Sequence, residues 1–204
     1  MGFYRDAIVP RLCDLSMRNK LLRPYRERVT GGAEGRVLEI GAGGGMNLPL
    51  YGARVTEILA LEPDHHLTTK AGRRAMDARC PVTFLEAPAE EIPLDDGSID
   101  TVVTTWTLCS IKDAAGALGE MRRVLRPNGQ LLFVEHGLAP DTSVRRWQNR
   151  IDSVWTRVSG GCHLNRPIVA MIETSGFKID RLDTGYAPGP KPMTFFYEGR
   201  AQPR

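Results

Sequence analysis

Apolar and polar positions follow two alternating patterns along most of the chain. Short apolar, β-branched runs at residues 36–40, 56–62, 81–86 and 98–106 predict buried strands. Between them, residues 65–78 and 113–126 repeat apolar positions every three or four residues, which is typical of helices packed on one face. A Pro-Asn-Gly turn then leads into a fifth apolar run at 130–136. Strand and helix therefore alternate regularly over the first two thirds of the chain.

This alternation predicts the fold class. Strand-helix-strand units connect through right-handed crossovers and produce a parallel sheet covered by helices. The tail departs from the pattern, with a helix expected near 168–175 and two strand-like segments at 177–186 and 193–199 joined by a Pro/Gly-rich stretch. We expect an α/β, doubly wound, Rossmann-like sheet of seven strands. It should be mostly parallel, with an antiparallel last strand and helices on both faces.

Two segments lie outside the alternating core and are expected to cover its open edge. One is the N-terminus, where residues 5–19 have a helical pattern and a second helix begins at Pro24. The other is residues 143–161, whose apolar stripe runs beside several arginines. A chain of 204 residues fits a single domain. We divide it into an N-terminal helical cap (1–35), a core (36–136), a helical cap insertion (137–176) and closing antiparallel strands (177–204).

Composition and charge limit the kinds of partner that the protein can bind. Apolar residues make up 42% and charged residues 25%, and the net charge of +3 includes no long run of like charges. This argues against a nucleic-acid partner and favours a small molecule. No apolar stretch reaches the roughly 18 residues that span a membrane, so we expect a cytoplasmic protein without stable membrane insertion. The four cysteines form no CxxC pair, so their spacing predicts neither a metal site nor a disulfide framework.

A glycine loop directly follows the first predicted strand. Glu39, Gly41, Gly43 and Gly45 occupy alternate positions, and NLPLY after them is expected to continue into a helix. Glycine is needed where φ is positive or where a ligand approaches the backbone closely. We expect a side chain at Gly41 or Gly43 to occupy the space of a ligand. Without further signals, a tight turn with no ligand explains such a cluster equally well.

A second residue makes a nucleoside ligand the better interpretation. Glu62 ends the second predicted strand, 23 residues after Glu39, where a carboxylate can accept hydrogen bonds from both ribose hydroxyls. Dinucleotide sites share these features, but their fingerprint would require a small residue where this chain has Met46. A nicotinamide-dependent oxidoreductase is therefore the weaker alternative.

Several motifs in this order resemble those of class I methyltransferases that use S-adenosylmethionine (SAM). The loop 39–45 is similar to their ExGxGxG signature, the segment 87–103 to their stretch after strand three, and 122–136 to their RVLKPGG motif. The resemblance implies SAM as cofactor, S-adenosylhomocysteine as product, and a ribose contact from Glu62. Pro88 replaces an aspartate that often contacts the adenine in this family. The cofactor-binding residues implied are Glu39, Gly41, Gly43, Gly45, Asn47, Glu62, Pro63, Ala89, Glu90 and Thr105.

The methyl acceptor is less constrained. Methyl transfer needs the acceptor lone pair in line with the methyl group, and a thiol needs a weaker base than an alcohol. His136, at the expected end of the fifth strand, is the candidate catalytic base, although a histidine in such a loop more often only bonds to backbone. Trp106, Trp147, Trp155 and His163 are candidate substrate contacts, and the resemblance puts Trp106, with Thr105, near the methionine part of SAM. Packing is the commoner role of residues such as Trp147 and Trp155, and a structural hydrogen bond that of a residue such as His163. A catalytic cysteine is not expected, because free cysteines usually act as small core hydrophobes.

The chain after Arg36 also resembles, more specifically, enzymes that methylate alkyl thiols, without the N-terminal membrane anchor of the animal proteins. Thiol S-methylation of a small apolar acceptor is therefore the leading hypothesis. Phospholipid or other N- or O-methylation remains an alternative, since the core motifs are shared. A non-catalytic SAM-binding or partner protein is the alternative from another class.

Overall fold

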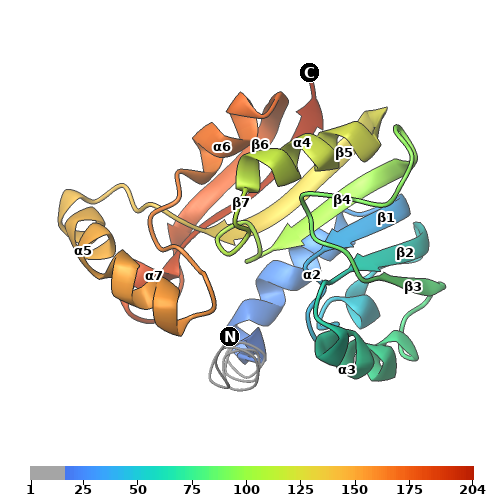
Figure 1. Ribbon diagram of the computed structural model, residues 1–204, viewed down its shortest axis with the longest axis horizontal. Helices are drawn as coiled ribbons and strands as arrows, with labels where there is room; N and C mark the ends of the chain where they lie inside the picture. Colours follow the sequence, from blue (N-terminus) through green and yellow to red (C-terminus); the bar gives the residue numbers. More distant parts are fainter. Residues whose placement is uncertain (1–16) are drawn as a thin grey trace.

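A computed structural model describes residues 17–204, which form a seven-stranded sheet in the order β3-β2-β1-β4-β5-β7-β6 (Figure 1). Strands β1 to β5 pair in parallel, whereas β7 is antiparallel to both neighbours, β5 and β6. This confirms the predicted Rossmann-like sheet and its antiparallel strand. The strands are β1 (Gly35–Ile40), β2 (Val55–Leu61), β3 (Val82–Leu85), β4 (Ile99–Thr105), β5 (Leu125–His136), β6 (Phe177–Tyr186) and β7 (Phe195–Pro203).

Helices cover both faces of the sheet, and side chains that alternate along the strands divide the core in two. Leu38 packs with Leu118 of α4 and Ile172 of α6, whereas its neighbour Val37 packs with Val29 of α2 on the opposite face. Helix α5 packs against α7 beyond the end of β5 (Figure 1). The helices are η2 (Lys20–Leu22), α2 (Arg23–Gly31), η3 (Leu48–Leu50), α3 (His65–Ala75), α4 (Ala114–Val124), α5 (Thr142–Val158), α6 (Ile168–Thr174) and α7 (Lys191–Thr194).

Local signals define several element boundaries. Pro24 lies in the first turn of α2, as expected, because proline has no N–H to lose there. Asp64 begins α3 by accepting a hydrogen bond from the backbone N–H of His66, and Asp113 caps α4 in the same way through Gly116. These caps place the starts of α3 and α4 immediately beside the loops that follow β2 and β4.

Two local expectations are wrong. The segment after the glycine loop forms only one 3₁₀ turn, η3, because the backbone becomes extended at Tyr51 and Gly52 follows it. Strand β5 begins at Leu125, before the expected Pro-Asn-Gly turn, which is accommodated as an irregularity in its pairing with β4. The expected N-terminal helix at 5–19 lies almost entirely outside the described residues. The division into caps and core stays a prediction. Within residues 17–204, no helix combines the length and hydropathy needed to cross a membrane.

Candidate functional site

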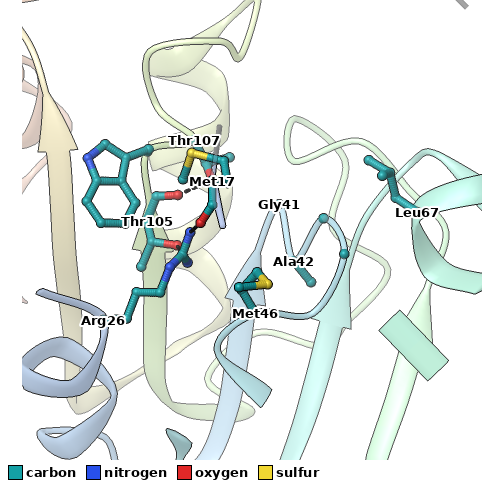
Figure 2. A pocket seen from close by; sticks show the side chains of 11 residues that line it. Met17, Arg26, Gly41, Ala42, Met46, Leu67, Thr105 and Thr107 are labelled. Atoms are coloured by element: carbon teal, nitrogen blue, oxygen red, sulfur yellow. Dashed lines mark hydrogen bonds between the residues drawn. The ribbon is translucent and has the colours of Figure 1, made fainter. Parts of the chain in front are cut away.

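A cavity of about 120 Å³ lies where the strand order reverses between β1 and β4. Open α/β sheets bind ligands at this switch point, outside the carboxyl ends of the strands. Figure 2 shows Arg26 pointing from α2 toward Thr105 on one side, with Leu67 of α3 on the other. The cavity is lined by Met17, Arg26, Gly41, Ala42, Gly43, Gly44, Met46, Leu67, Thr105, Trp106 and Thr107.

The glycine loop forms one wall of the cavity. Its glycines are required for different physical reasons. Gly41, Gly43 and Gly45 all have positive φ, at 63°, 54° and 75°. A Cβ on Gly43 would meet only the carbonyl oxygen of Gly41, at 3.9 Å, as expected for a backbone that faces a ligand. A Cβ on Gly41 would instead overlap the side chain of Thr107, so the expected ligand clash is replaced there by packing between the β1 and β4 loops.

Glu62 follows β2 and lies next to this loop. One carboxylate oxygen accepts the N–H of Gly43 at 2.9 Å, and the other accepts the N–H of Asp64 at 3.1 Å. Burial raises the pKa of Glu62 above its ordinary value, although both backbone hydrogen bonds oppose the shift. A carboxylate oxygen can accept two hydrogen bonds, so each oxygen keeps capacity for one more donor. The side chain is thus oriented by the loop and able to accept a pair of hydroxyls.

A buried polar network lies beneath the loop. Glu39 is fully buried and accepts hydrogen bonds from Asn47 Nδ2 and Tyr51 Oη, both at 2.9 Å. Burial raises the pKa of Glu39 to about 7. Asn47 also donates to Thr105 Oγ1 at 3.1 Å, which joins the end of β4 to the loop after β1. Glu39 and Asn47 therefore position Thr105 at the cavity but do not line it themselves.

Arg26 is a cavity residue that the sequence did not predict. It extends from α2 and donates through Nη1 to Asn47 Oδ1 at 2.7 Å. It is only 5% exposed, and its Nε has no hydrogen-bond partner in the described part of the chain. Burial lowers its pKa, while the nearby Glu39 opposes that change. A buried guanidinium that lines a cavity is suited to binding an anionic group, since the anion compensates for the desolvated charge.

Trp106 follows β4 directly and carries the one positive φ, 52°, among the non-glycine residues described. Such strained backbone concentrates at functional sites. Its ring lies under the Arg26 guanidinium, 4.9 Å from the ring centroid, and contacts Phe196 edge-on at 5.5 Å. The predicted substrate residue Trp106 and the predicted cofactor residue Thr105 thus both line the cavity.

The other predicted residues lie away from the cavity lining. Pro63 is exposed after Glu62, Ala89 is buried in the core, and Glu90 accepts the N–H of Asp113. On the cap insertion, Trp147 is 58% exposed. Trp155 is only partly exposed, and His163 pairs with Asp152 at 2.9 Å. The roles predicted for these six residues stay predictions.

His136 belongs to a cluster that spacing along the chain did not reveal. Its Nε2 lies 3.4 Å from Cys162 Sγ, and the ligating atoms of Cys109, His136 and Cys162 all lie within 4.8 Å of one another. Burial lowers the pKa of His136, but hydrogen bonds to Cys162 and to the backbone of His163 raise it to above its ordinary value overall. Cysteine spacing alone was therefore a poor guide, because residues from three separate segments meet here.

Comparison with known proteins relates this geometry to a family. The family model described as "Methyltransferase domain" matches residues 38–133. The chain is 38% identical over 157 residues to the thiol S-methyltransferase TMT1B of Homo sapiens, which covers 72% of this chain and 62% of that protein. It is 31% identical over 174 residues to the thiol S-methyltransferase TMT1B of Rattus norvegicus. This match covers 82% of this chain and 70% of that protein. The chain belongs to the SAM-dependent methyltransferase family. It spans between about three fifths and 70% of the length of these two relatives.

A solved structure supports the fold of this methyltransferase. A SAM-dependent methyltransferase from Aquifex aeolicus superposes with a TM-score of 0.67 at 17% identity and covers 96% of this chain and 98% of that one. SAM is the cofactor of the family, and the chain's own residues fit it. Gly43 leaves room against its backbone, Glu62 keeps two acceptor positions, and the buried Arg26 lines the cavity with its positive charge.

Proposed function

We propose that this methyltransferase transfers the methyl group of SAM to the thiol of a small apolar molecule. The observation that carries the proposal is the similarity of the chain to thiol S-methyltransferases, with 38% identity over 72% of the chain and 31% over 82%. The methyl donor follows from the family, and the acceptor class from these relatives. Cytoplasmic action on a free small molecule is part of the same proposal.

The nucleoside end of SAM is assigned to the loop side of the cavity. Glu62 accepts the two ribose hydroxyls, since both of its oxygens are already oriented by backbone donors. Gly41 and Gly43 keep the backbone close to the ligand, Gly45 lets the loop pack against Ala71 of α3, and Leu67 supplies an apolar contact from the same helix. Contacts of Pro63, Ala89 and Glu90 with the nucleoside stay part of the proposal, although none of the three lines the cavity.

The methionine end is assigned to the side occupied by Arg26. The guanidinium pairs with the carboxylate of SAM, because that anion compensates for the desolvated cation. Asn47 and Glu39 act through hydrogen bonds that hold Thr105 and Arg26 in place. Trp106 and the methionines 17 and 46 form an apolar boundary that excludes water from the reacting atoms.

SAM supplies an activated methyl group on a sulfonium, so the chain mainly needs to align the acceptor and exclude water. A thiolate is accessible near neutral pH without a strong base. His136 does not line the cavity, and its Nε2 faces Cys162. Our mechanism therefore does not depend on the predicted catalytic role of His136. Trp147, Trp155 and His163 stay as predicted contacts for the outer part of the acceptor.

The test is a turnover screen that measures S-adenosylhomocysteine release. Acceptors are matched in their carbon skeleton and offer a thiol, a phenol, an alcohol or an amine, and phospholipid vesicles form a further arm. We expect turnover with apolar thiols and little with the other groups. Glu62→Ala serves as the cofactor-site control and should lose SAM affinity by roughly 10- to 100-fold, as for other lost charged hydrogen bonds. Preference for amines or hydroxyls, or SAM binding without turnover of any acceptor, would refute the thiol proposal.

A further inference from the structure

Three side chains suited to a soft metal ion converge beside the proposed active site. Cys109 lies on the segment after β4, three residues beyond the cavity-lining Trp106, whose carbonyl oxygen is 3.4 Å from Cys109 Sγ. His136 is the last residue of β5, and Cys162 lies on the turn after α5. Their ligating atoms all lie within 4.8 Å of one another.

The spacing of these atoms is close to that of a tetrahedral zinc site. Zinc binds thiolate sulfur at about 2.3 Å and imidazole nitrogen at about 2.0–2.1 Å. Tetrahedral angles then place sulfur and nitrogen about 3.6 Å apart, and two sulfurs about 3.8 Å apart. The observed distance between Cys162 Sγ and His136 Nε2 is 3.4 Å. The other two pairs of ligating atoms lie no more than 4.8 Å apart, so those side chains must close on an ion by about 1 Å at most.

The surrounding backbone holds the cluster together. The N–H of His163 donates to the carbonyl of Cys109 at 2.9 Å, which ties the turn carrying Cys162 to the segment after β4. Gly160 and Gly161, with φ of 73° and 99°, form the turn that brings Cys162 back toward the sheet. Arg166 donates through Nη2 to the carbonyl of Ile111 at 2.6 Å and so fixes the other side of that segment.

We propose that Cys109, His136 and Cys162 form a Zn²⁺ site with three protein ligands and a water in the fourth position. Two thiols and an imidazole match the preference of zinc, whereas Mg²⁺ and Ca²⁺ prefer oxygen ligands. Cys109 and His136 are buried, and the partly exposed Cys162 provides a path for entry. Each thiol binds as a thiolate and releases its proton to the solvent.

This site stands independently of the proposed thiol specificity, because it rests on the three side chains and not on the acceptor. It also gives His136 a different role from the one that the sequence suggested. A zinc-bound Nε2 cannot accept a proton from an acceptor. The cluster would then connect the end of β5, the β4 loop and the cap insertion through one ion.

The test uses Co²⁺ as a spectroscopic probe on the reduced full chain, without chelator. We expect one equivalent of Co²⁺ to produce thiolate-to-cobalt charge-transfer absorption, and one equivalent of Zn²⁺ to abolish it. Cys109→Ser and Cys162→Ser should each lower zinc affinity by at least about 100-fold, beyond the 10- to 100-fold typical of lost outer-shell contacts. Cys80→Ser is the matched control, since Cys80 lies outside the cluster, and it should bind metal as the unaltered chain does.

A second measurement covers variants that fold poorly. Zn²⁺ should raise the melting temperature of the unaltered chain and of Cys80→Ser, but not that of His136→Asn or of either cluster-cysteine variant. The proposal is overturned if the reduced chain shows no charge-transfer band, or if the band survives replacement of both cluster cysteines. It is also overturned if mass spectrometry finds that these two cysteines form a disulfide that zinc and reductant do not prevent.

Discussion

Arg26 is proposed to bind the carboxylate of SAM, and its neighbourhood allows a sharp test of that role. Its side chain is 5% exposed, and Nε has no partner among the described residues. We expect Arg26→Ala to raise the dissociation constant for S-adenosylhomocysteine by about 10- to 100-fold, since a hydrogen bond to a charged group contributes about 1.5–3 kcal/mol. Isothermal titration calorimetry would measure this dissociation constant.

The design includes a ligand control and a protein control. An analogue without the methionine carboxylate should bind Arg26→Ala and the unaltered chain about equally, because the partner of the guanidinium is missing. Arg28→Gln removes an arginine from the same helix whose guanidinium pairs with Glu198 at 2.6 Å, and it should leave affinity unchanged. If Arg26→Ala weakens both ligands to the same extent, the residue acts only on the structure of the site.

At this scale, local sequence signals predicted one wall of the cavity but not the other. Gly43 and Glu62 end neighbouring parallel strands, so order along the chain brings them to one edge, where Gly43 donates to Glu62. Arg26 comes from a helix outside the alternating core, and nothing in its local pattern distinguishes it from Arg23 or Arg28. Its burial depends on how α2 packs, which periodicity does not specify.

Helix α5 shows, at the scale of an element, that a local sequence pattern does not specify tertiary packing. Its apolar stripe predicted an amphipathic helix, which is correct, but the stripe is not its main contact. Val144 and Gln148 are the buried residues, whereas Trp147 and Val154 are 58% and 61% exposed. A pattern identifies a face of a helix without identifying what covers it. The glutamine that anchors α5 had no distinguishing signal in the sequence.

Gln148 should therefore matter more to stability than the tryptophan beside it. Its Oε1 accepts the N–H of Ala139 at 2.9 Å, and its Nε2 donates to the carbonyls of Gly137 and Pro192 at 2.9 and 3.1 Å. Gln148→Ala leaves these buried backbone groups unpaired, so we expect a loss of about 1–3 kcal/mol or more in unfolding free energy. Urea denaturation would measure it.

Trp147→Gln is the adjacent control and should change the unfolding free energy by less than about 0.5 kcal/mol, as is usual for exposed positions. A loss at Trp147 equal to that at Gln148 would mean that the exposed stripe is covered in solution, contrary to this assignment. Equal and small effects would mean that α5 is not anchored through Gln148.

For the whole molecule, alternation of strand and helix was enough to predict the sheet, because crossover handedness and strand pairing leave few topologies. The Cys109, His136 and Cys162 cluster was not predictable in this way. Its members are separated by 27 and 26 residues and meet only because β4 and β5 are neighbours and the turn after α5 returns to them. No short motif carries that information.

Buried ionisable groups set how stability depends on pH. Burial raises the pKa of both Glu39 and Glu135 to about 7, and raises that of Glu62. In the unfolded chain these carboxyls ionise near their ordinary pKa, about 4.3. Between there and pH 7 the unfolded state releases protons that the folded state keeps, so the unfolding free energy falls as pH rises and levels off above about pH 7.

The raised pKa of His136 acts in the same direction, because its proton favours the folded state and is lost as pH increases. Urea unfolding should be measured at pH 5, 6, 7 and 8 with chelator present. The unfolding free energy should decline over this range by an amount on the order of 1–3 kcal/mol for each fully buried carboxyl. The double variant Glu39→Gln, Glu135→Gln should flatten most of it, because glutamine does not titrate. Stability that rises with pH across this window would mean that both carboxylates are ionised in the folded protein and are held by Arg26, Asn47 and the backbone donors around them.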